Sequence, residues 1–319
     1  MGIGAWIGTW FMLAFVLGLL AVMLDGNVDG AAIVLGVGLI AGAVWLSQQR
    51  RHEFVQILAL MVSLTGQGLF IGGVGSTSDS LRTGATAGLL LSLVLIPLFE
   101  DRIHRFLSTL GIVGALAALT FDARLPHANE ALVIGLLAVV LVVWRVAPRN
   151  WRTEYAEIAG PVASGAIVSV FGLLLLGSFL GFFELGRSPW LTIGGPVTAA
   201  AVLGLLWLVH EVMDEHEPGQ FGPEAIAASV AIVALAGLTW RTPAIVTTLL
   251  IVLLAFDRRS RTLLGLAIAF FLAFGALYYY NLEMTLLRKS GILAGSGVLC
   301  LAAWTAVRRW SAASGEAHA

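Results

Sequence analysis

Long apolar stretches alternate with short polar connections along the whole chain. A transmembrane helix needs about 20 predominantly apolar residues, and a helix surrounded by others can be shorter. The pattern therefore predicts an all-α polytopic transmembrane helical bundle of about twelve spans. The predicted spans are residues 3–24, 31–47, 54–74, 84–99, 106–121, 131–147, 158–183, 191–213, 225–240, 243–256, 262–280 and 284–307. Every connection is short, which leaves no extramembrane domain for a soluble active site.

Composition excludes a water-soluble globular protein. Of the 319 residues, 59% are hydrophobic and 12% charged, and the mean hydropathy is +0.93. The net charge is −1, and Lys and Arg occur only in ones to threes, so no nucleic-acid partner is expected. The first apolar stretch lacks a positive leader and is too long for a signal sequence, so it should stay as the first span. The single cysteine, Cys300, is expected to be an apolar packing residue.

Positive charges set the predicted topology, because cytoplasmic loops carry an excess of Lys and Arg. With twelve spans and a cytoplasmic N-terminus, twelve of the 18 Lys and Arg residues lie on the inner side. The alternative joins residues 225–256 into one helix. This alternative leaves nine Lys and Arg residues inside against eight outside, and it puts Arg241 within the membrane. We therefore expect a break at "TWRTP" and both termini in the cytoplasm.

Two similar stretches suggest an internal repeat. "RTGATAGLLLSLVLIPLFEDRIHR" and "RTPAIVTTLLIVLLAFDRRSR" share R-T-x-A, an apolar helix and D-R-x-x-R, which aligns Asp101 with Asp257. This predicts a first six-span half at 1–156, a second at 157–310 and a cytoplasmic tail at 311–319. The alignment needs a three-residue gap, and basic loops after apolar helices also recur by chance, so both interpretations stay open.

The third span carries polar residues among glycines in "SLTGQGLFIGG". Gly68 and Gly72 are four residues apart, which is the spacing that lets a neighbouring helix approach closely. Gln67 can hydrogen-bond across such a contact. The alternatives are helix packing and a polar lining for a solute path.

The acidic stretch "LVHEVMDEHEPGQFGPE" ends the eighth span. His210 and Asp214, and Glu211 and Glu215, are each four residues apart, so each pair can face one side of a helix. Such ligands can hold a divalent cation. The zincin pattern is not met, because Asp214 stands where its second histidine belongs. We expect a solvated acidic loop without metal; a cation site and a docking surface for a basic partner are the alternatives.

The remaining motifs give no catalytic site. Pro161 and Pro196 are interpreted as first-turn prolines, with a broken helix at a substrate site as the alternative. No phosphate-binding loop, dinucleotide fingerprint or paired catalytic carboxylates appear. We expect neither an enzyme nor a cofactor.

Charges interrupt the last apolar region at "YYYNLEMTLLRKSG". In one interpretation Asn281 caps the last helix, so that Lys289 lies about 10 Å inside it and needs a partner. In the other, Ser290 caps it and the preceding residues anchor at the interface. The candidate functional positions here are Tyr279, Tyr280, Glu283, Thr285, Arg288 and Lys289.

The same stretch carries a family resemblance. Its Y-Y-x-L-x-x-T-L-L-x-K-S pattern resembles the C-terminal signature of a bacterial membrane family called domain of unknown function 4401, and "LTGQGLF" is similar to a second feature. The clear match covers roughly the last 65 residues. The resemblance implies a multi-pass protein of the bacterial inner membrane and a partner of the GDYXXLXY family. It implies no activity.

Two functions of different class follow from these observations. The resemblance favours a non-enzymatic subunit of an envelope complex with a GDYXXLXY-like partner. The possible duplication and the intramembrane charge favour a secondary transporter or channel for a small solute or ion. The first is the preferred interpretation.

Overall fold

The computed structural model describes residues 28–49, 53–146, 153–182, 194–216, 223–238, 240, 242–281, 290 and 294. These residues are 92% helical and contain no strand. The helices are α2 (Val28–Gln48), α3 (Glu53–Ser78), α4 (Leu81–Leu98), α5 (Arg102–Asp122), α6 (Ala128–Leu141) with the π-helical turn η1 (Val142–Val146), α7 (Thr153–Phe182), α8 (Gly195–His216), α9 (Pro223–Leu238), α10 (Pro243–Asp257) and α11 (Arg261–Asn281).

The chain is a helical membrane protein. Six of the described helices, α2, α3, α4, α5, α7 and α8, are long and apolar enough to cross a membrane, and four apolar helices are shorter. Large apolar side chains such as Leu90, Val94 and Leu272 are more than half exposed, which suits a surface that faces lipid. Ten of the twelve predicted segments coincide with these helices. Segments 3–24 and 284–307 lie outside the described residues, so the count of twelve remains a prediction.

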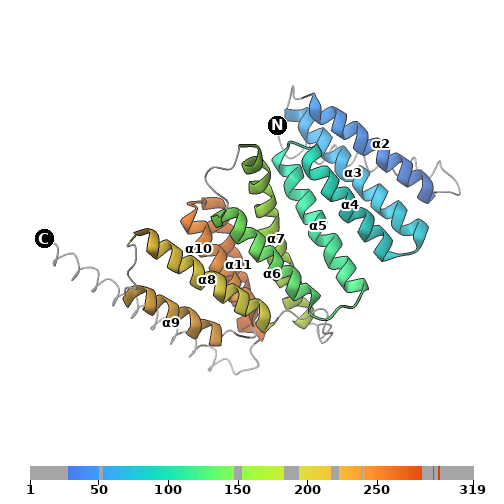
Figure 1. Ribbon diagram of the computed structural model, residues 1–319. Coiled ribbons are helices and arrows are strands. Elements are labelled where there is room, and N and C mark those ends of the chain that lie inside the picture. The colour runs from blue at the N-terminus through green and yellow to red at the C-terminus, as the bar shows by residue number, and fades with distance from the viewer. Residues whose placement is uncertain are drawn as a thin grey trace.

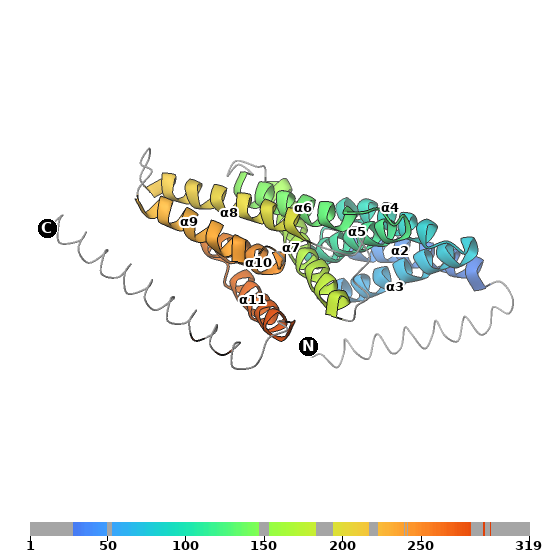
Figure 2. The ribbon, with the colours of Figure 1, turned by 90° about the horizontal axis from the view of Figure 1, so that it is seen from below.

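The helices pack as two groups joined by α7 (Figure 1). On one side α2, α3, α4 and α5 lie in a row, each against the next, and α5 contacts α7. On the other side α6 packs on α7 and α8, while α8 also contacts α9 and α10, and α10 contacts α11. Figure 2 shows the same division from below. The α5–α7 contact is therefore the main link between the two groups among the described residues.

The larger hydrophobic core surrounds α7. Val170 and Phe171 of α7 are fully buried, together with Leu208 of α8 and Ile251 of α10. The Phe171 ring stacks on Phe270 of α11 with a centroid distance of 4.3 Å. A second, small core of Ala43, Leu95 and Phe99 lies between α2 and α4. It borders the functional site described below.

The predicted break within residues 225–256 is confirmed. The first helix ends at Leu238 and the next begins at Pro243, whose fixed φ and missing N–H suit a first helical turn. The Thr198 hydroxyl of α8 donates to the Trp240 carbonyl at 3.2 Å and ties down the connection. Both helices contact α8.

The prediction for the glycines of α3 was wrong in its choice of face. Among the described residues, a Cβ at Gly68 or Gly72 would meet nothing within 4 Å, whereas a Cβ at Gly66 would lie 2.9 Å from the Gly36 carbonyl oxygen of α2. Gly73 approaches the Asp29 carbonyl oxygen equally closely. The α2–α3 contact therefore uses glycines seven residues apart, two turns along one face.

The two stretches of the proposed repeat differ locally. Asp101 is the N-cap of α5, and its carboxylate accepts from the His104 backbone N–H at 3.0 Å. Its counterpart Asp257 is the last residue of α10, and Ser260 accepts from the Leu263 N–H near the start of α11. The two six-span halves themselves stay a prediction.

The interpretation of Pro161 as a first-turn proline was wrong. The helix α7 begins at Thr153, so Pro161 is its ninth residue and lies in the helix interior. A proline there removes the N–H that would bind the carbonyl four residues earlier, which is that of Glu157. Pro196 is the second residue of α8 and fits its predicted first-turn position.

Candidate functional site

The connection between α4 and α5 is recessed relative to the connection between α2 and α3. The helices α3 and α4 join at their other ends through Asp79 and Ser80, and α3 has 26 residues whereas α4 has 18. A difference of eight residues corresponds to about 12 Å at 1.5 Å per residue. The start of α5 therefore lies level with a point about a third of the way along α3 and not with its end.

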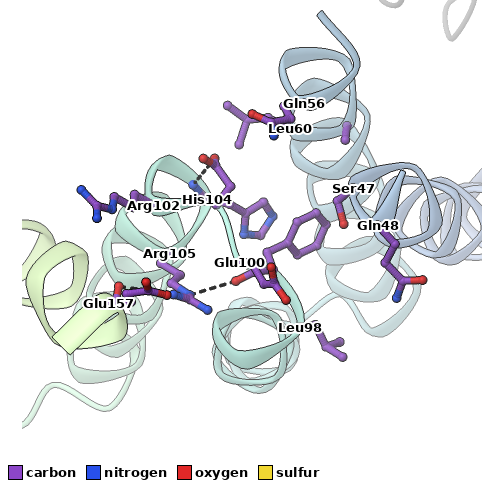
Figure 3. A pocket seen from close by; sticks show the side chains of 13 residues that line it. Ser47, Gln48, Gln56, Leu60, Leu98, Glu100, Arg102, His104, Arg105 and Glu157 are labelled. Atoms are coloured by element: carbon purple, nitrogen blue, oxygen red, sulfur yellow. Dashed lines mark hydrogen bonds between the residues drawn. The ribbon is translucent and has the colours of Figure 1, made fainter. Parts of the chain in front are cut away.

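A cavity of about 650 Å³ fills this recess. Its walls are the C-terminal end of α2 and the first turns of α3 and α7, and its floor is the α4–α5 junction (Figure 3). The lining residues are Ser47, Gln48, Gln56, Ala59, Leu60, Leu98, Phe99, Glu100, Asp101, Arg102, His104, Arg105 and Glu157. The charge-based topology predicts that this is the cytoplasmic end of the helices, which stays a prediction. We call this cavity the recess.

His104 lies at the floor of the recess. It is the third residue of α5, and the Asp101 cap fixes the start of that helix. The imidazole is only 1% exposed and stacks on the Phe99 ring at a centroid distance of 3.7 Å with an interplanar angle of 6°. Phe99 is itself buried, so the stacked pair separates the recess from the interior below it.

The buried face of His104 continues into a chain of hydrogen bonds between α3 and α5. Ser63 Oγ lies 2.8 Å from His104 Nε2, and Ser108 Oγ lies 3.2 Å from Nδ1. The Gln67 side-chain amide donates to Ser63 Oγ at 3.1 Å and lies 3.5 Å from His104 Nε2. Ser63 and Ser108 are almost fully buried. Polar groups at such depth in a membrane protein are paired between helices, as they are here.

The Ser63–His104 distance suits a nucleophile and its base, but the surroundings do not. Ser63 has no exposed surface and does not line the recess, so no substrate reaches its hydroxyl. The other ring nitrogen faces the hydroxyl of Ser108 and not a carboxylate. We interpret the pair as part of a polar link between helices.

Arg105 is the second polar side chain at the floor, and it is only 6% exposed. Its Nε donates to the carbonyl oxygens of Ile96 and Phe99, at 3.3 and 2.9 Å, at the C-terminal end of α4. Its Nη1 donates to the Glu157 carbonyl of α7 at 3.3 Å. This is the carbonyl that Pro161 leaves without its helical partner. One guanidinium therefore caps α4 and joins it to α5 and α7.

A second buried charge lies at the opposite end of the helices. Glu130, near the start of α6, is 4% exposed, and its Oε1 accepts from the Gly194 backbone N–H at 2.7 Å, just before α8. Its Oε2 lies 2.7 Å from His127 Nδ1. Gly195 packs so closely on the Trp240 ring that an added Cβ would come within 2.6 Å of it. These contacts fasten the starts of α6 and α8 together at this end.

Among the predicted site residues, Gln67 joins the buried network, where its side-chain amide lies 3.5 Å from His104 Nε2 of α5. Its role in a solute path stays a prediction. On α8, His210 is exposed and Glu211 half-buried, while the side chains of Asp214 and Glu215 are not described. No group of three His, Cys, Asp or Glu residues suited to a metal occurs in the described part of the chain. Glu283, Thr285, Arg288 and Lys289 lie outside the described residues, as do the side chains of Tyr279 and Tyr280.

The sequence-based search missed His104 and counted Arg105 as a loop charge. A usable signal was present. Ser63 and Gln67, and His104 and Ser108, are each four residues apart, so each pair occupies one helix face. The first pair already lay inside a predicted span, and Asp101, placed as an N-cap, would have put the second pair inside a helix as well.

Comparison with known proteins then places the chain in a family. The sequence model of the family described as "Domain of unknown function (DUF4401)" matches residues 1–310. The chain belongs to the DUF4401 family. The match corrects the expectation of a clear likeness over the C-terminal part only, because the DUF4401 match also includes the recess and the His104 network. No curated protein matches the chain, and no solved structure does so either.

Proposed function

We propose that this DUF4401 protein is a secondary transporter for a small polar or ionic solute, and that the recess is its binding vestibule. The observation that supports this proposal is the continuity of polar groups at the α4–α5 junction. A cavity of about 650 Å³ ends at His104, and hydrogen bonds run from that side chain to Ser63 and Gln67 in the interior.

The geometry fits one state of an alternating-access cycle. The recess is open at one end of the helices, and the stacked Phe99 and His104 rings close its floor. At the opposite end, Glu130 and Gly194 hold α6 and α8 together. Transporters expose a central site to one side at a time by moving helix groups against each other. The two helix groups that meet at α5 and α7 are suited to such movement.

Cysteine accessibility tests the proposal without a known solute. In a Cys300→Ala background, Gln56→Cys reports on the recess and Gln67→Cys on the interior behind His104. A membrane-impermeant maleimide is applied to each face of membrane vesicles. We expect Gln56→Cys to react from one face only and Gln67→Cys to react, more slowly, from both, because a transporter opens its interior to each side in turn.

Ser169→Cys provides the matched control, since Ser169 is buried on α7 and does not line the recess. It should stay protected from both faces. If Gln67→Cys is as protected as Ser169→Cys while Gln56→Cys reacts, then the His104 network is static helix packing and the transporter proposal is wrong.

A second candidate is the subunit of an envelope complex. Membership of DUF4401 over residues 1–310 is the observation in its favour, because the resemblance to that family implies a GDYXXLXY-like partner. Co-purification from the native membrane tests it. A stoichiometric GDYXXLXY-like partner that survives detergent extraction supports the subunit, and a monodisperse single chain contradicts it.

A further inference from the structure

A second cavity adjoins the recess. It has a volume of about 770 Å³ and is lined by Arg102, Ile103, Phe106, Trp144, Glu157, Gly160, Pro161 and Ser164, from α5, η1 and α7. Arg102 and Glu157 line both cavities, so they form a common rim. Both volumes lie in the range of about 300 to 1,000 Å³ that is typical of ligand pockets. We call the second cavity the groove.

The groove is mostly apolar and lies beside an exposed apolar residue of a candidate membrane span. Ile103, on the candidate span α5, is 57% exposed beside it, and Phe106 and Trp144 complete its aromatic wall. Gly160 leaves space in the groove, since a Cβ there would meet nothing within 4 Å. Trp144 stands on a π-helical turn, a local irregularity that is often found at functional sites.

The rim carries one charge of each sign. Within the described part of the chain, neither the Arg102 guanidinium nor the Glu157 carboxylate has a side-chain partner, and both residues are exposed. In Figure 3 the Arg102 side chain extends away from the floor of the recess. A singly charged ligand would satisfy one of the two groups and be repelled by the other. A zwitterion matches both, because a phosphate suits the arginine and an ammonium group suits the carboxylate.

We infer that the ligand of this site is a phospholipid with a primary ammonium head group, bound with its head in the recess and an acyl chain in the groove. The inference rests on the proposed binding vestibule, and it replaces the small polar solute by a lipid of which only the zwitterionic head group enters the recess. The lipid enters sideways from the membrane past Ile103, and its phosphate binds Arg102 while its ammonium group binds Glu157. Choline would fit less well, because its quaternary nitrogen has no N–H to donate to a carboxylate.

Lipid binding to the purified full-length protein tests this inference. The protein in detergent is titrated with phosphatidylethanolamine, phosphatidylcholine and phosphatidylglycerol, and bound lipid is measured by native mass spectrometry. Gly160→Phe fills the groove, and Arg102→Gln removes the phosphate partner. We expect each substitution to weaken phosphatidylethanolamine binding about tenfold or more, a change that one lost charged contact readily produces.

Gly172→Phe is the matched control. It lies on the same helix as Gly160 and has equally open space at its Cβ, but it lies outside the groove. Its affinity for phosphatidylethanolamine should equal that of the unmodified protein. Equal affinities in Gly160→Phe and Gly172→Phe, or equal binding of the three lipids, would identify unspecific boundary lipid and overturn the inference.

The two proposals fail separately. If Gln67→Cys reacts from both faces while the lipids bind without preference, the transporter proposal stands and its solute is not a lipid. If phosphatidylethanolamine binding depends on Gly160 while Gln67→Cys is protected from both faces, the groove holds lipid in a protein that does not transport it.

Discussion

The buried arginine at the α4–α5 junction gives the sharpest test of the fold. Arg105→Met keeps much of the apolar stem and removes the guanidinium, which donates to three carbonyl oxygens on α4 and α7. The neighbouring carboxylates are exposed or otherwise bonded, so the loss is mainly one of hydrogen bonds and not of a buried ion pair.

The expected magnitude follows from these three bonds. A hydrogen bond that involves a charged group contributes about 1.5–3 kcal/mol, and two of the three are long at 3.3 Å. Once the guanidinium is removed, water in the recess can bind some of the exposed carbonyl oxygens and offset part of the loss. We therefore expect a loss of about 3 kcal/mol, which lowers the melting temperature by roughly 4–6 °C for a chain of this size. Thermal unfolding in detergent, followed by loss of the monodisperse chromatographic peak, measures the change.

Arg261→Met is the matched control, because Arg261 is the counterpart of Arg105 in the sequence repeat. It is the first residue of α11 and is exposed. Its substitution should change the melting temperature by about 1 °C or less, as is usual at the surface. The melting-temperature shift of Arg105→Lys should lie between these two, since the lysine ammonium group carries its donors at one point and cannot reach carbonyls of both α4 and α7. Equal shifts for Arg105→Met and Arg261→Met would refute the buried cap.

Three further predictions use the same unfolding assay. Gly66→Leu should lower stability by about 2 kcal/mol or more, because its Cβ would clash with α2, whereas Gly68→Leu should have little effect; equal effects would contradict the observed glycine face. Glu130→Ala should cost about 2 kcal/mol by leaving the bound backbone N–H without an acceptor, and Glu130→Gln, which keeps an acceptor, clearly less. Pro161→Ala restores a donor to the carbonyl that the buried arginine binds, so it should recover about 1 kcal/mol in Arg105→Met; strictly additive effects would contradict this link.

The helices followed from the sequence because their ends carry local signals. Ten predicted segments coincide with helices, and the break before Pro243 was placed correctly, since proline cannot continue a helix and suits the start of the next. Apolar length alone does not show whether a shorter helix crosses the whole membrane, and four described helices are of this shorter kind. The count of spans therefore depends on more than hydropathy.

Helix faces were harder to predict than helix positions. In a soluble helix the apolar stripe points to the core, but in lipid both faces are apolar and the pattern carries no such direction. The sequence "GQGLFIGG" offers several glycine pairs, and four-residue spacing selected Gly68 and Gly72. The contact uses Gly66 and Gly73, a choice fixed by how α2 packs and not by the spacing within α3.

The site was missed for a related reason. The chain of polar groups joins Ser63 to His104 across 41 residues, and no local pattern predicts which distant helix a buried serine meets. Arg105 was misplaced because D-R-x-x-R resembles a loop of exposed charges. The Asp101 cap starts the helix within that motif, so its two arginines differ: Arg102 is exposed and Arg105 is buried.

The recess itself originates in one local feature of α4. Pro97 stands one residue before the end of that helix, where it lacks the N–H for a helical bond, and the chain leaves the helix after Leu98. Three residues later Asp101 starts α5, so the connection stays about 12 Å below the start of α3. The carbonyls left open at the end of α4 then require a buried donor, and Arg105 supplies it from the first turn of α5. An early stop in one helix thus accounts for the cavity, for the buried cation at its floor and for the depth at which His104 meets α3.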